Sequence, residues 1–254
     1  MLAGVTLVAN GIKLKYSFVL CIENLLKCCD NVYVSADVNN KDDTTKVIRD
    51  RFCGKVNLIE TEWDWGITNG TDLAYRANLC IEKALQDKND MVQYVQADEI
   101  ADFYEVNKLK NYKIWGKTNF SLERTYFWKD LYHINRSWTH NLVRLGVLNQ
   151  KVKVTSDGMY MDIDSNFNTL IVPNSVCRIY HYSRVGSTQC IASRLNNLDL
   201  LFHEKNEFTP LDDYNFGINN NFESGVATAI IEEYQGEHPD GAEEFFDEWV
   251  DRNT

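Results

Sequence analysis

The chain has 254 residues, of which 44% are hydrophobic and 12% aromatic, and this is enough apolar material for one sizeable core. With 26 basic and 37 acidic residues the formal net charge is −11, which gives no general attraction for nucleic acid or anionic membranes. Only three prolines occur and no Gly/Ser-rich or Pro-rich linker is present, so we expect a single domain over residues 1–254.

The cysteines and the N-terminus indicate the compartment. The seven cysteines form no CxxC pair and have no regular spacing. The N-terminus lacks the basic and apolar regions of a signal peptide, and no apolar run approaches the roughly 18 residues of a membrane span. We therefore expect reduced thiols in a cytoplasmic protein without a membrane span.

The first hundred residues alternate short apolar runs with helical patterns. The runs that favour strands are residues 4–8, 32–34, 56–59 and 91–95. The helices between them contain Phe18 and Ile22, begin at Thr44 or Thr45, or begin at Thr71 or Asp72. Alternating strands and helices require crossover connections, so we expect an α/β fold with a mostly parallel central sheet flanked by helices.

Polar residues follow these strands at their carboxyl ends, where α/β sheets bind ligands. They are Asn10, Asp37, Thr61, Glu62, Asp98 and Glu99. No GxGxxG or GxxxxGK[ST] motif occurs, which disfavours a Rossmann dehydrogenase and a P-loop NTPase. Carboxylates without a glycine-rich phosphate loop favour Mn²⁺ or Mg²⁺ as the group that contacts phosphates. An ordinary strand-end turn explains the Asp-Glu pair equally well when it is taken alone.

The second half has a looser pattern. Residues 120–128 alternate like a strand, and residues 187–203 and 241–250 have helical periodicity. Trp128, Tyr132, His133 and Trp138 form an aromatic stretch that is either a sugar-stacking floor for an acceptor or ordinary packing. The acidic segment 232–251 indicates a solvated helix face.

The strand-end segment Gln96-Ala97-Asp98-Glu99 is one of several short segments that together resemble glycosyltransferase family 2, of the GT-A fold. The others are residues 5–11, 34–37, 43–45, 59–64, 138–144, 157–158, 179–184 and 236–239, in the same order along the chain. The likeness is greatest to small bacterial and viral members with a Gln-(Ala/Gly)-Asp-Glu motif. It implies a nucleotide-sugar-binding half over residues 1–100 and an acceptor half with C-terminal helices over residues 101–254.

The resemblance also implies a metal site. Asp98 corresponds to the metal-binding carboxylate of an Asp-x-Asp-type motif, with Glu99 beside it, although Gln96 stands in place of the first carboxylate. His181, on the expected late strand 176–182, corresponds to the histidine that completes this site in many GT-A enzymes. The implied cofactor is Mn²⁺ or Mg²⁺.

Further residues are implied to contact the donor, a nucleoside diphosphate sugar. Asn10 and Asp37 lie where the family contacts the nucleoside, and Arg76 and Asn78 lie on the helix that faces the donor. Arg184 lies three residues after His181, and its planar guanidinium suits diphosphate oxygens.

Asp157 is the expected catalytic base, because the family places an acidic residue in the corresponding acceptor-side loop and an inverting enzyme needs a carboxylate there. An ordinary Asp-Gly turn explains Asp157 equally well.

The resulting hypothesis is a hexosyl- or pentosyltransferase whose metal assists departure of the diphosphate. We expect a saccharide or protein acceptor, with a hydroxylated DNA base as the alternative. A sugar-phosphate nucleotidyltransferase and a non-catalytic sugar-binding module remain alternatives; Gly11-Ile12-Lys13-Leu14-Lys15 is a poor version of the loop that the former needs.

Overall fold

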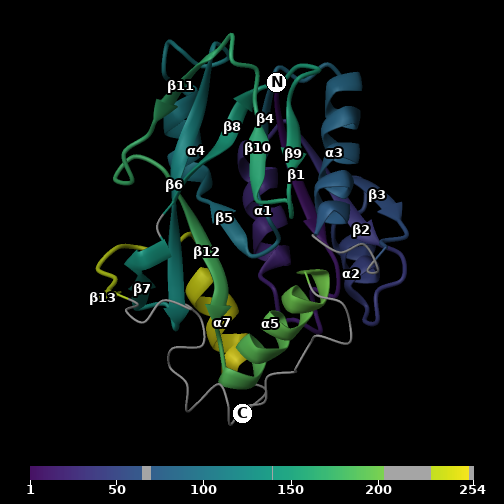
Figure 1. The fold of residues 1–254 in the computed structure, drawn as a ribbon, viewed down its shortest axis with the longest axis vertical. Helices are drawn as coiled ribbons and strands as arrows, with labels where there is room; N and C mark the ends of the chain where they lie inside the picture. Colours follow the sequence, from purple (N-terminus) through teal and green to yellow (C-terminus); the bar gives the residue numbers. More distant parts are fainter. Residues whose placement is uncertain (65–69, 139, 203–229, 252–254) are drawn as a thin grey trace.

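The computed structural model describes residues 1–64, 70–138, 140–202 and 230–251, in which helices flank a curled central sheet (Figure 1). The elements of the N-terminal half are β1 (Leu2–Val8), α1 (Phe18–Cys28), β2 (Asn31–Asp37), α2 (Thr44–Arg51), β3 (Asn57–Thr61), α3 (Thr71–Gln86), β4 (Met91–Tyr94), β5 (Glu99–Ala101) and α4 (Phe103–Lys110). Those that follow are β6 (Thr118–Lys129), β7 (His133–Asn135), the 3₁₀ helix η1 (Arg136–Trp138), β8 (His140–Val147), β9 (Lys153–Thr155), β10 (Tyr160–Asp162), β11 (Asn168–Ile171), β12 (Arg178–Val185), α5 (Thr188–Phe202), β13 (Ile231–Glu233) and α7 (Ala242–Asp251).

The expected α/β class is confirmed. Strands β3, β2, β1 and β4 are neighbours in this order and run parallel, as the crossover helices require. Beyond β4 the sheet continues through β8, which is antiparallel to it, and then through β6. The long strand β6 also pairs in parallel with β11 and β12. The sheet is therefore parallel in the first hundred residues and mixed after them.

Alternation along the strands builds a core on each face of the sheet. Val5 packs in the same cluster as Ala77 of α3, on one face. Leu2 and Val8, which have the opposite parity, belong to the cluster that contains Ile22 of α1. The two helices thus cover opposite faces of β1, which leaves the carboxyl ends of the strands available for a ligand site.

Several boundaries differ from the sequence prediction by a few residues. The N-cap of α3 is Gly70, with φ +65°, whereas the sequence predicts Thr71 or Asp72 at this position. Thr71 is already the first residue of the helix. The late strand β12 begins at Arg178 and continues to Val185. The expected helix 187–203 is α5, and His203 and Thr139 of the predicted segments lie outside the described residues. No helix in the described part of the chain is long and apolar enough to cross a membrane.

Strand pairing brings three distant segments to one point beyond β4. The chain turns after β4 into the short strand β5, which pairs antiparallel with β12 so that Glu99 lies opposite His181. Tyr182 N donates a hydrogen bond to Asp98 O at 2.9 Å, which fixes the turn on β12. On its other edge β12 pairs with β6, and His181 lies opposite Tyr126. Register alone thus places the Asp-Glu motif next to the predicted histidine.

Candidate active site

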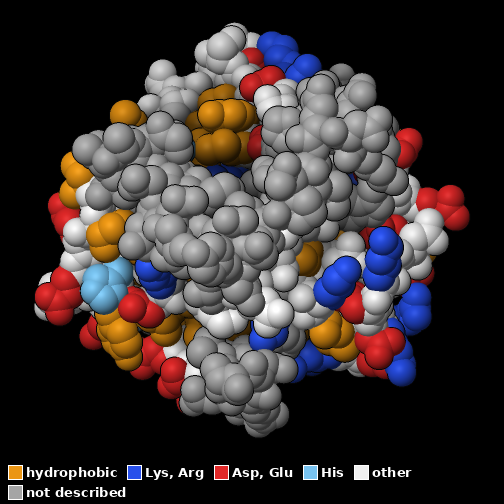
Figure 2. Space-filling model, turned by 60° about the horizontal axis from the view of Figure 1, so that its bottom comes forward, with side chains coloured by type: hydrophobic (Ala, Val, Ile, Leu, Met, Phe, Trp, Pro, Cys, Tyr) orange, Lys and Arg blue, Asp and Glu red, His pale blue; other side chains and the backbone are white. Residues whose placement is uncertain are grey.

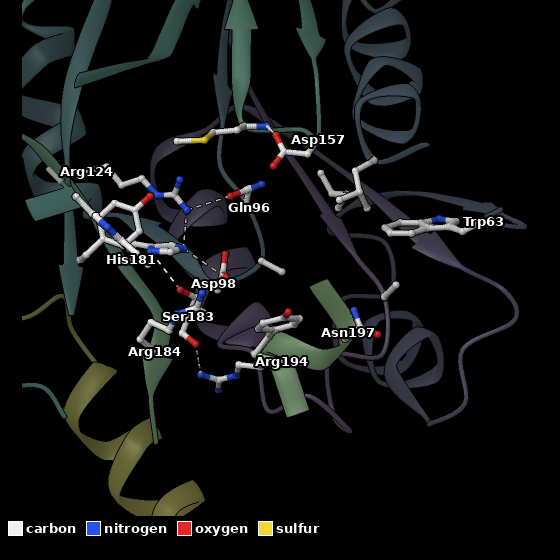
Figure 3. Close-up of a pocket in the computed structure, with 18 residues that line it drawn as sticks. Trp63, Gln96, Asp98, Arg124, Asp157, His181, Ser183, Arg184, Arg194 and Asn197 are labelled. Carbon is white, nitrogen blue, oxygen red and sulfur yellow. Dashed lines mark hydrogen bonds and ion pairs between the residues drawn. The ribbon is translucent and has the colours of Figure 1, made fainter. Parts of the chain in front are cut away.

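A cavity of about 380 Å³ opens beyond the carboxyl ends of β1 and β4, a size typical of small-molecule sites. Figure 2 views the molecule from below and shows a hollow with apolar side chains inside it. The apolar and aromatic lining of the cavity includes Leu7, Tyr16, Trp63, Leu73, Tyr126 and Trp138. Its polar lining includes Gln96, Asp98, Arg124, Asp157, His181, Ser183, Arg184, Arg194 and Asn197 (Figure 3).

The structure brings four of the predicted site residues together in this lining: Asp98, Asp157, His181 and Arg184. Figure 3 shows Asp157 above Asp98, with His181 toward the left of the view and Trp63 at the far right. Asp157 lies in the β9–β10 turn and Asp98 in the turn after β4. His181 belongs to β12, and Trp63 to the segment after β3. The cavity is therefore assembled from both halves of the chain.

Asp98 and His181 have the protonation states that a cation site needs. His181 Nε2 lies 3.5 Å from Asp98 Oδ2. Burial, reinforced by the charge of Arg124, lowers the pKa of His181 to about 4, so the imidazole is neutral at pH 7. Burial acts to raise the pKa of Asp98, but interactions with His181, Arg124 and Arg194 outweigh it and lower the pKa, so the carboxylate is ionised. Metal ligands of both kinds must be deprotonated.

Arg124, which the sequence analysis did not single out, lies directly against this pair. Its Nη2 is 2.5 Å from His181 Nε2 and 3.3 Å from Gln96 Oε1. Its guanidinium also lies over the ring of Tyr126, 4.7 Å from the centroid. The signal was present in the sequence, because an arginine within the apolar alternation of residues 120–128 requires a buried partner.

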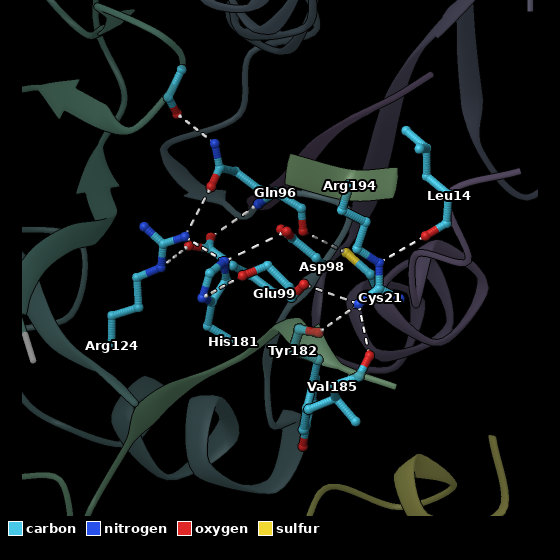
Figure 4. A network of polar contacts seen from close by, with 12 residues as sticks. Leu14, Cys21, Gln96, Asp98, Glu99, Arg124, His181, Tyr182, Val185 and Arg194 are labelled. Atoms are coloured by element: carbon cyan, nitrogen blue, oxygen red, sulfur yellow. Dashed lines mark hydrogen bonds and ion pairs between the residues drawn. The ribbon is translucent and has the colours of Figure 1, made fainter. Parts of the chain in front are cut away.

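Glu99 is fully buried and binds two arginines, of which Figure 4 shows Arg124. Its Oε1 lies 2.8 Å from Arg144 Nη2 and 2.8 Å from Arg124 Nε, and its Oε2 accepts a hydrogen bond from Gln96 N at 3.0 Å. Burial opposes ionisation, but Arg144 and Arg124 lower the pKa of Glu99 below its usual value. We refer to these three side chains as the Arg144–Glu99–Arg124 triad.

The triad changes the expected ligand set for a metal. Both oxygens of Glu99 are engaged by Arg144, Arg124 and the backbone N–H of Gln96, so neither is open to a cation in this arrangement. Within the described ranges, no three His, Cys, Asp or Glu side chains are arranged to hold a metal ion. The remaining pair still fits Mn²⁺ or Mg²⁺, because one carboxylate and one imidazole suffice where substrate phosphates and water complete the coordination.

Asp157 lies in the turn between β9 and β10 and lines the cavity, and its role as the catalytic base stays a prediction. Gly158 has φ +82°, and a Cβ there would lie 3.1 Å from Tyr94 Oη, so glycine is needed. Tyr94 Oη donates to Gly158 O at 2.5 Å, and Arg144 Nη1 donates to Met159 O at 2.8 Å. These bonds hold the turn on the end of β4, which directs Asp157 into the cavity lining.

Asn10 and Asp37 do not line the cavity. Asn10 has φ +51° and accepts a hydrogen bond from Lys41 N at 3.0 Å. Asp37 is fully buried, and its Oδ1 accepts from Asn39 N at 2.9 Å and from Trp63 N at 3.3 Å. Both side chains hold the loops that follow β1 and β2, and Asp37 thereby fixes the backbone of a residue that does line the cavity.

Arg76 and Asn78 are also directed elsewhere. Arg76 forms a buried ion pair with Asp72, one turn earlier on α3, at 2.9 Å. Asn78 exchanges two hydrogen bonds with the backbone of Val154, at 2.9 and 2.7 Å. The amide of Asn78 therefore fixes β9, the strand that leads into the turn with Asp157.

Arg194 is a further buried arginine in the lining that the sequence analysis missed. Its guanidinium donates to the carbonyl oxygens of Leu14, Lys15, Tyr182, Ser183 and Val185. These bonds tie α5 to β12 and to the segment after β1. A buried arginine bound to uncharged carbonyls keeps its positive charge close to the cavity.

The charges of the described residues in the lining sum to a positive value. Among these residues are three arginines (Arg124, Arg184 and Arg194) and two carboxylates (Asp98 and Asp157), which gives 3 − 2 = +1. Adding Arg144 and Glu99 beneath it leaves the sum unchanged. The whole chain, by contrast, carries −11. A positive cavity in an acidic protein concentrates anionic ligands at this point.

Part of the predicted aromatic stretch reaches the cavity. Trp138 lines it and makes an edge contact with Tyr126, with ring centroids 5.8 Å apart. Tyr132 is 63% exposed, and His133 is exposed and paired with Asp130. The stretch therefore divides between surface residues and an aromatic corner of the cavity.

No protein-family model matches the chain, and no curated protein matches its sequence. Among solved structures, it aligns with S. aureus TarS 1–349 in complex with UDP-GlcNAc at 16% identity and a TM-score of 0.36, over 50% of this chain and 34% of that one. It also aligns with a Bacillus anthracis protein described as a glucose-1-phosphate thymidylyltransferase, in complex with a sucrose, at 10% identity and a TM-score of 0.36, over 72% and 74% of the two chains. The chain thus spans about a third of the TarS structure. Neither likeness is strong enough to assign a function.

Proposed function

We propose that the protein is a metal-assisted glycosyltransferase whose donor is a nucleoside diphosphate sugar. The observation that supports this most directly is the positive cavity wall, with three arginines near the Asp98–His181 pair, in a chain of net charge −11. A diphosphate is the anionic ligand that such a wall suits. The aromatic and apolar lining, including Trp63, suits the nucleoside and sugar portions.

Each charged residue has a role in this proposal. Asp98 and His181 would hold Mn²⁺ or Mg²⁺, which supplies Lewis-acid stabilisation to the departing diphosphate. Arg184 and Arg194 place fixed positive charge in the same wall, where negative charge develops. Asp157, which also lines the cavity, would accept the proton of the acceptor hydroxyl as the new glycosidic bond forms.

For the acceptor we propose a saccharide or a glycan carried by a protein. Trp138 and Tyr126 form an aromatic corner in the cavity wall, and aromatic faces pack well against sugar rings. A hydroxylated base in DNA is disfavoured by the charge of −11, which repels the phosphate backbone of a duplex. A hexose and a pentose remain equally compatible as the transferred sugar.

The test is a thermal-shift screen of UDP-, GDP- and dTDP-sugars with and without Mn²⁺, with a CMP-sugar as a monophosphate comparison. We expect a metal-dependent rise in Tm with at least one diphosphate donor, together with metal-stimulated release of the nucleoside diphosphate. Asp98→Ala should abolish the metal-dependent part of the rise in Tm, while Asp162→Ala, at an exposed strand position, should leave that rise intact. The proposal fails if Asp98→Ala retains the same shift and full activity.

The same samples separate the two alternatives. A sugar-phosphate nucleotidyltransferase would instead release pyrophosphate from a nucleoside triphosphate when a sugar 1-phosphate is added. A binding module would give the thermal shift with no release of nucleoside diphosphate from any donor.

A further inference from the structure

The contact between Arg124 and His181 determines which nitrogen of the imidazole is available. Arg124 Nη2 lies 2.5 Å from His181 Nε2, and a guanidinium can only donate hydrogen bonds. His181 Nε2 must therefore accept, which places the ring proton on Nδ1. Nδ1 lies 3.4 Å from Ser183 Oγ, which is able to accept a hydrogen bond from the Nδ1–H group. The tautomer follows from these positions without reference to pH.

A metal ion needs the same lone pair that Arg124 occupies. Asp98 Oδ2 lies 3.5 Å from His181 Nε2, so a cation shared by the two side chains would bind through Nε2. A neutral imidazole has one lone pair, and it cannot accept from Arg124 and coordinate a cation together. The positive charge of the Arg124 guanidinium, 2.5 Å from His181 Nε2, also repels a divalent cation bound to this nitrogen.

Arg124 is held in a way that allows this contact to open. Its Nε side is fixed by Glu99 Oε1 at 2.8 Å, beneath the cavity. Its Nη2 faces the cavity and contacts Gln96 Oε1 at 3.3 Å in addition to His181. The guanidinium can therefore turn Nη2 toward a ligand in the cavity and keep its ion pair with Glu99. Phosphate oxygens are strong acceptors for such a group.

We propose that Arg124 is a positioning residue that blocks cation binding at Asp98 and His181 until the donor diphosphate draws its guanidinium away from His181. This inference rests on the proposed function, because it takes a diphosphate as the ligand that moves Arg124. By thermodynamic linkage, the cation and the donor then increase each other's affinity. Cation binding without a nucleotide is correspondingly weak.

The test measures Mn²⁺ binding without any nucleotide, by the electron paramagnetic resonance signal of free Mn²⁺. Arg124→Gln should bind Mn²⁺ about tenfold more tightly than the native protein, since a charge-assisted hydrogen bond no longer competes for Nε2. Arg124→Lys, which keeps a charge but lacks the forked guanidinium, should show a smaller gain. Arg49→Gln removes the same charge from an exposed ion pair with Glu60 and should change nothing.

The sign of the effect separates this role from a structural one, because damage to the site weakens metal binding whereas release of His181 strengthens it. Circular dichroism establishes that the variants are folded, and Arg124→Lys alone decides if Arg124→Gln does not fold. Mn²⁺ affinity equal to or weaker than native in the folded variant overturns the inference. So does a lack of Mn²⁺ binding in every protein. The proposed glycosyl transfer is judged separately, by release of nucleoside diphosphate in the native protein.

Discussion

Glu99→Gln distinguishes the two roles that Glu99 can have. The sequence predicts a metal ligand, whereas the structure shows the central carboxylate of the Arg144–Glu99–Arg124 triad. Glutamine has the same shape and retains one acceptor oxygen, but it removes the negative charge between two guanidinium groups. A ligand role predicts a loss of metal affinity at nearly native stability. The triad predicts a large loss of stability.

The size of that loss follows from burial. Glu99 and Arg144 are 0% exposed and Arg124 is 5% exposed, so neither guanidinium gains compensating hydration when the carboxylate charge is removed. Removing one partner of a buried ion pair costs about 3–5 kcal/mol. For a chain of this size, about 1 kcal/mol corresponds to roughly 2–4 °C in Tm. We therefore expect Tm to fall by about 10 °C.

The assay is thermal unfolding followed by circular dichroism at pH 7, with Glu60→Gln as the matched control. Glu60 pairs with Arg49 on the surface, and exposed ion pairs contribute under about 1 kcal/mol. The control should therefore lose no more than about 4 °C. A Glu99→Gln protein that unfolds within a few degrees of native, yet binds Mn²⁺ much more weakly, would refute the triad as the role of Glu99.

Three further predictions concern catalysis and pH. Asp157→Asn should lower the rate of nucleoside diphosphate release by about 10²–10⁴-fold at unchanged Tm, while Asp162→Asn, in the same hairpin, should not. Because the folded pKa of His181 is about 4, the unfolded state binds a proton first as pH falls from 6.5. Stability should thus decline from pH 6.5 toward 4, and less steeply in His181→Gln, as measured by urea unfolding. The contribution of Glu99, whose folded pKa is lowered, should persist above about pH 4.5 and disappear in stronger acid, which the difference between native and Glu99→Gln reports.

The parallel half of the fold was predictable because its signals are local. Each of its strands is an apolar run, each crossover helix has an apolar face, and the two must alternate in a parallel sheet. The order of β6, β8 and β12 was not predictable in this way. Their pairing depends on contacts between segments such as Glu123 and Arg178, far apart in sequence, and no local pattern encodes it.

The difference between local and long-range signals also explains which residues of the site could be predicted from the sequence. Asp98, His181, Asp157 and Arg184 lie at the cavity because the order of the strands brings their segments together. Asn10 and Asp37 also follow strands, yet loops use such residues to satisfy their own backbone N–H groups, and sequence does not separate the two uses. Arg124 is different, because a charged residue within an apolar strand is a visible signal.

Gln96 is the point where this chain departs from an Asp-x-Asp motif, and its contacts supply a physical reason. Its Oε1 accepts from Arg124 at 3.3 Å, and its Nε2 lies 3.5 Å from Gly158 O, in the turn that carries Asp157. An amide can accept on one side and donate on the other, whereas an ionised carboxylate can only accept. A carboxylate here would face the Gly158 carbonyl without a proton to offer and would add negative charge between Asp98 and Asp157. The departure therefore suits a site in which an arginine, and not a second acidic side chain, contacts His181.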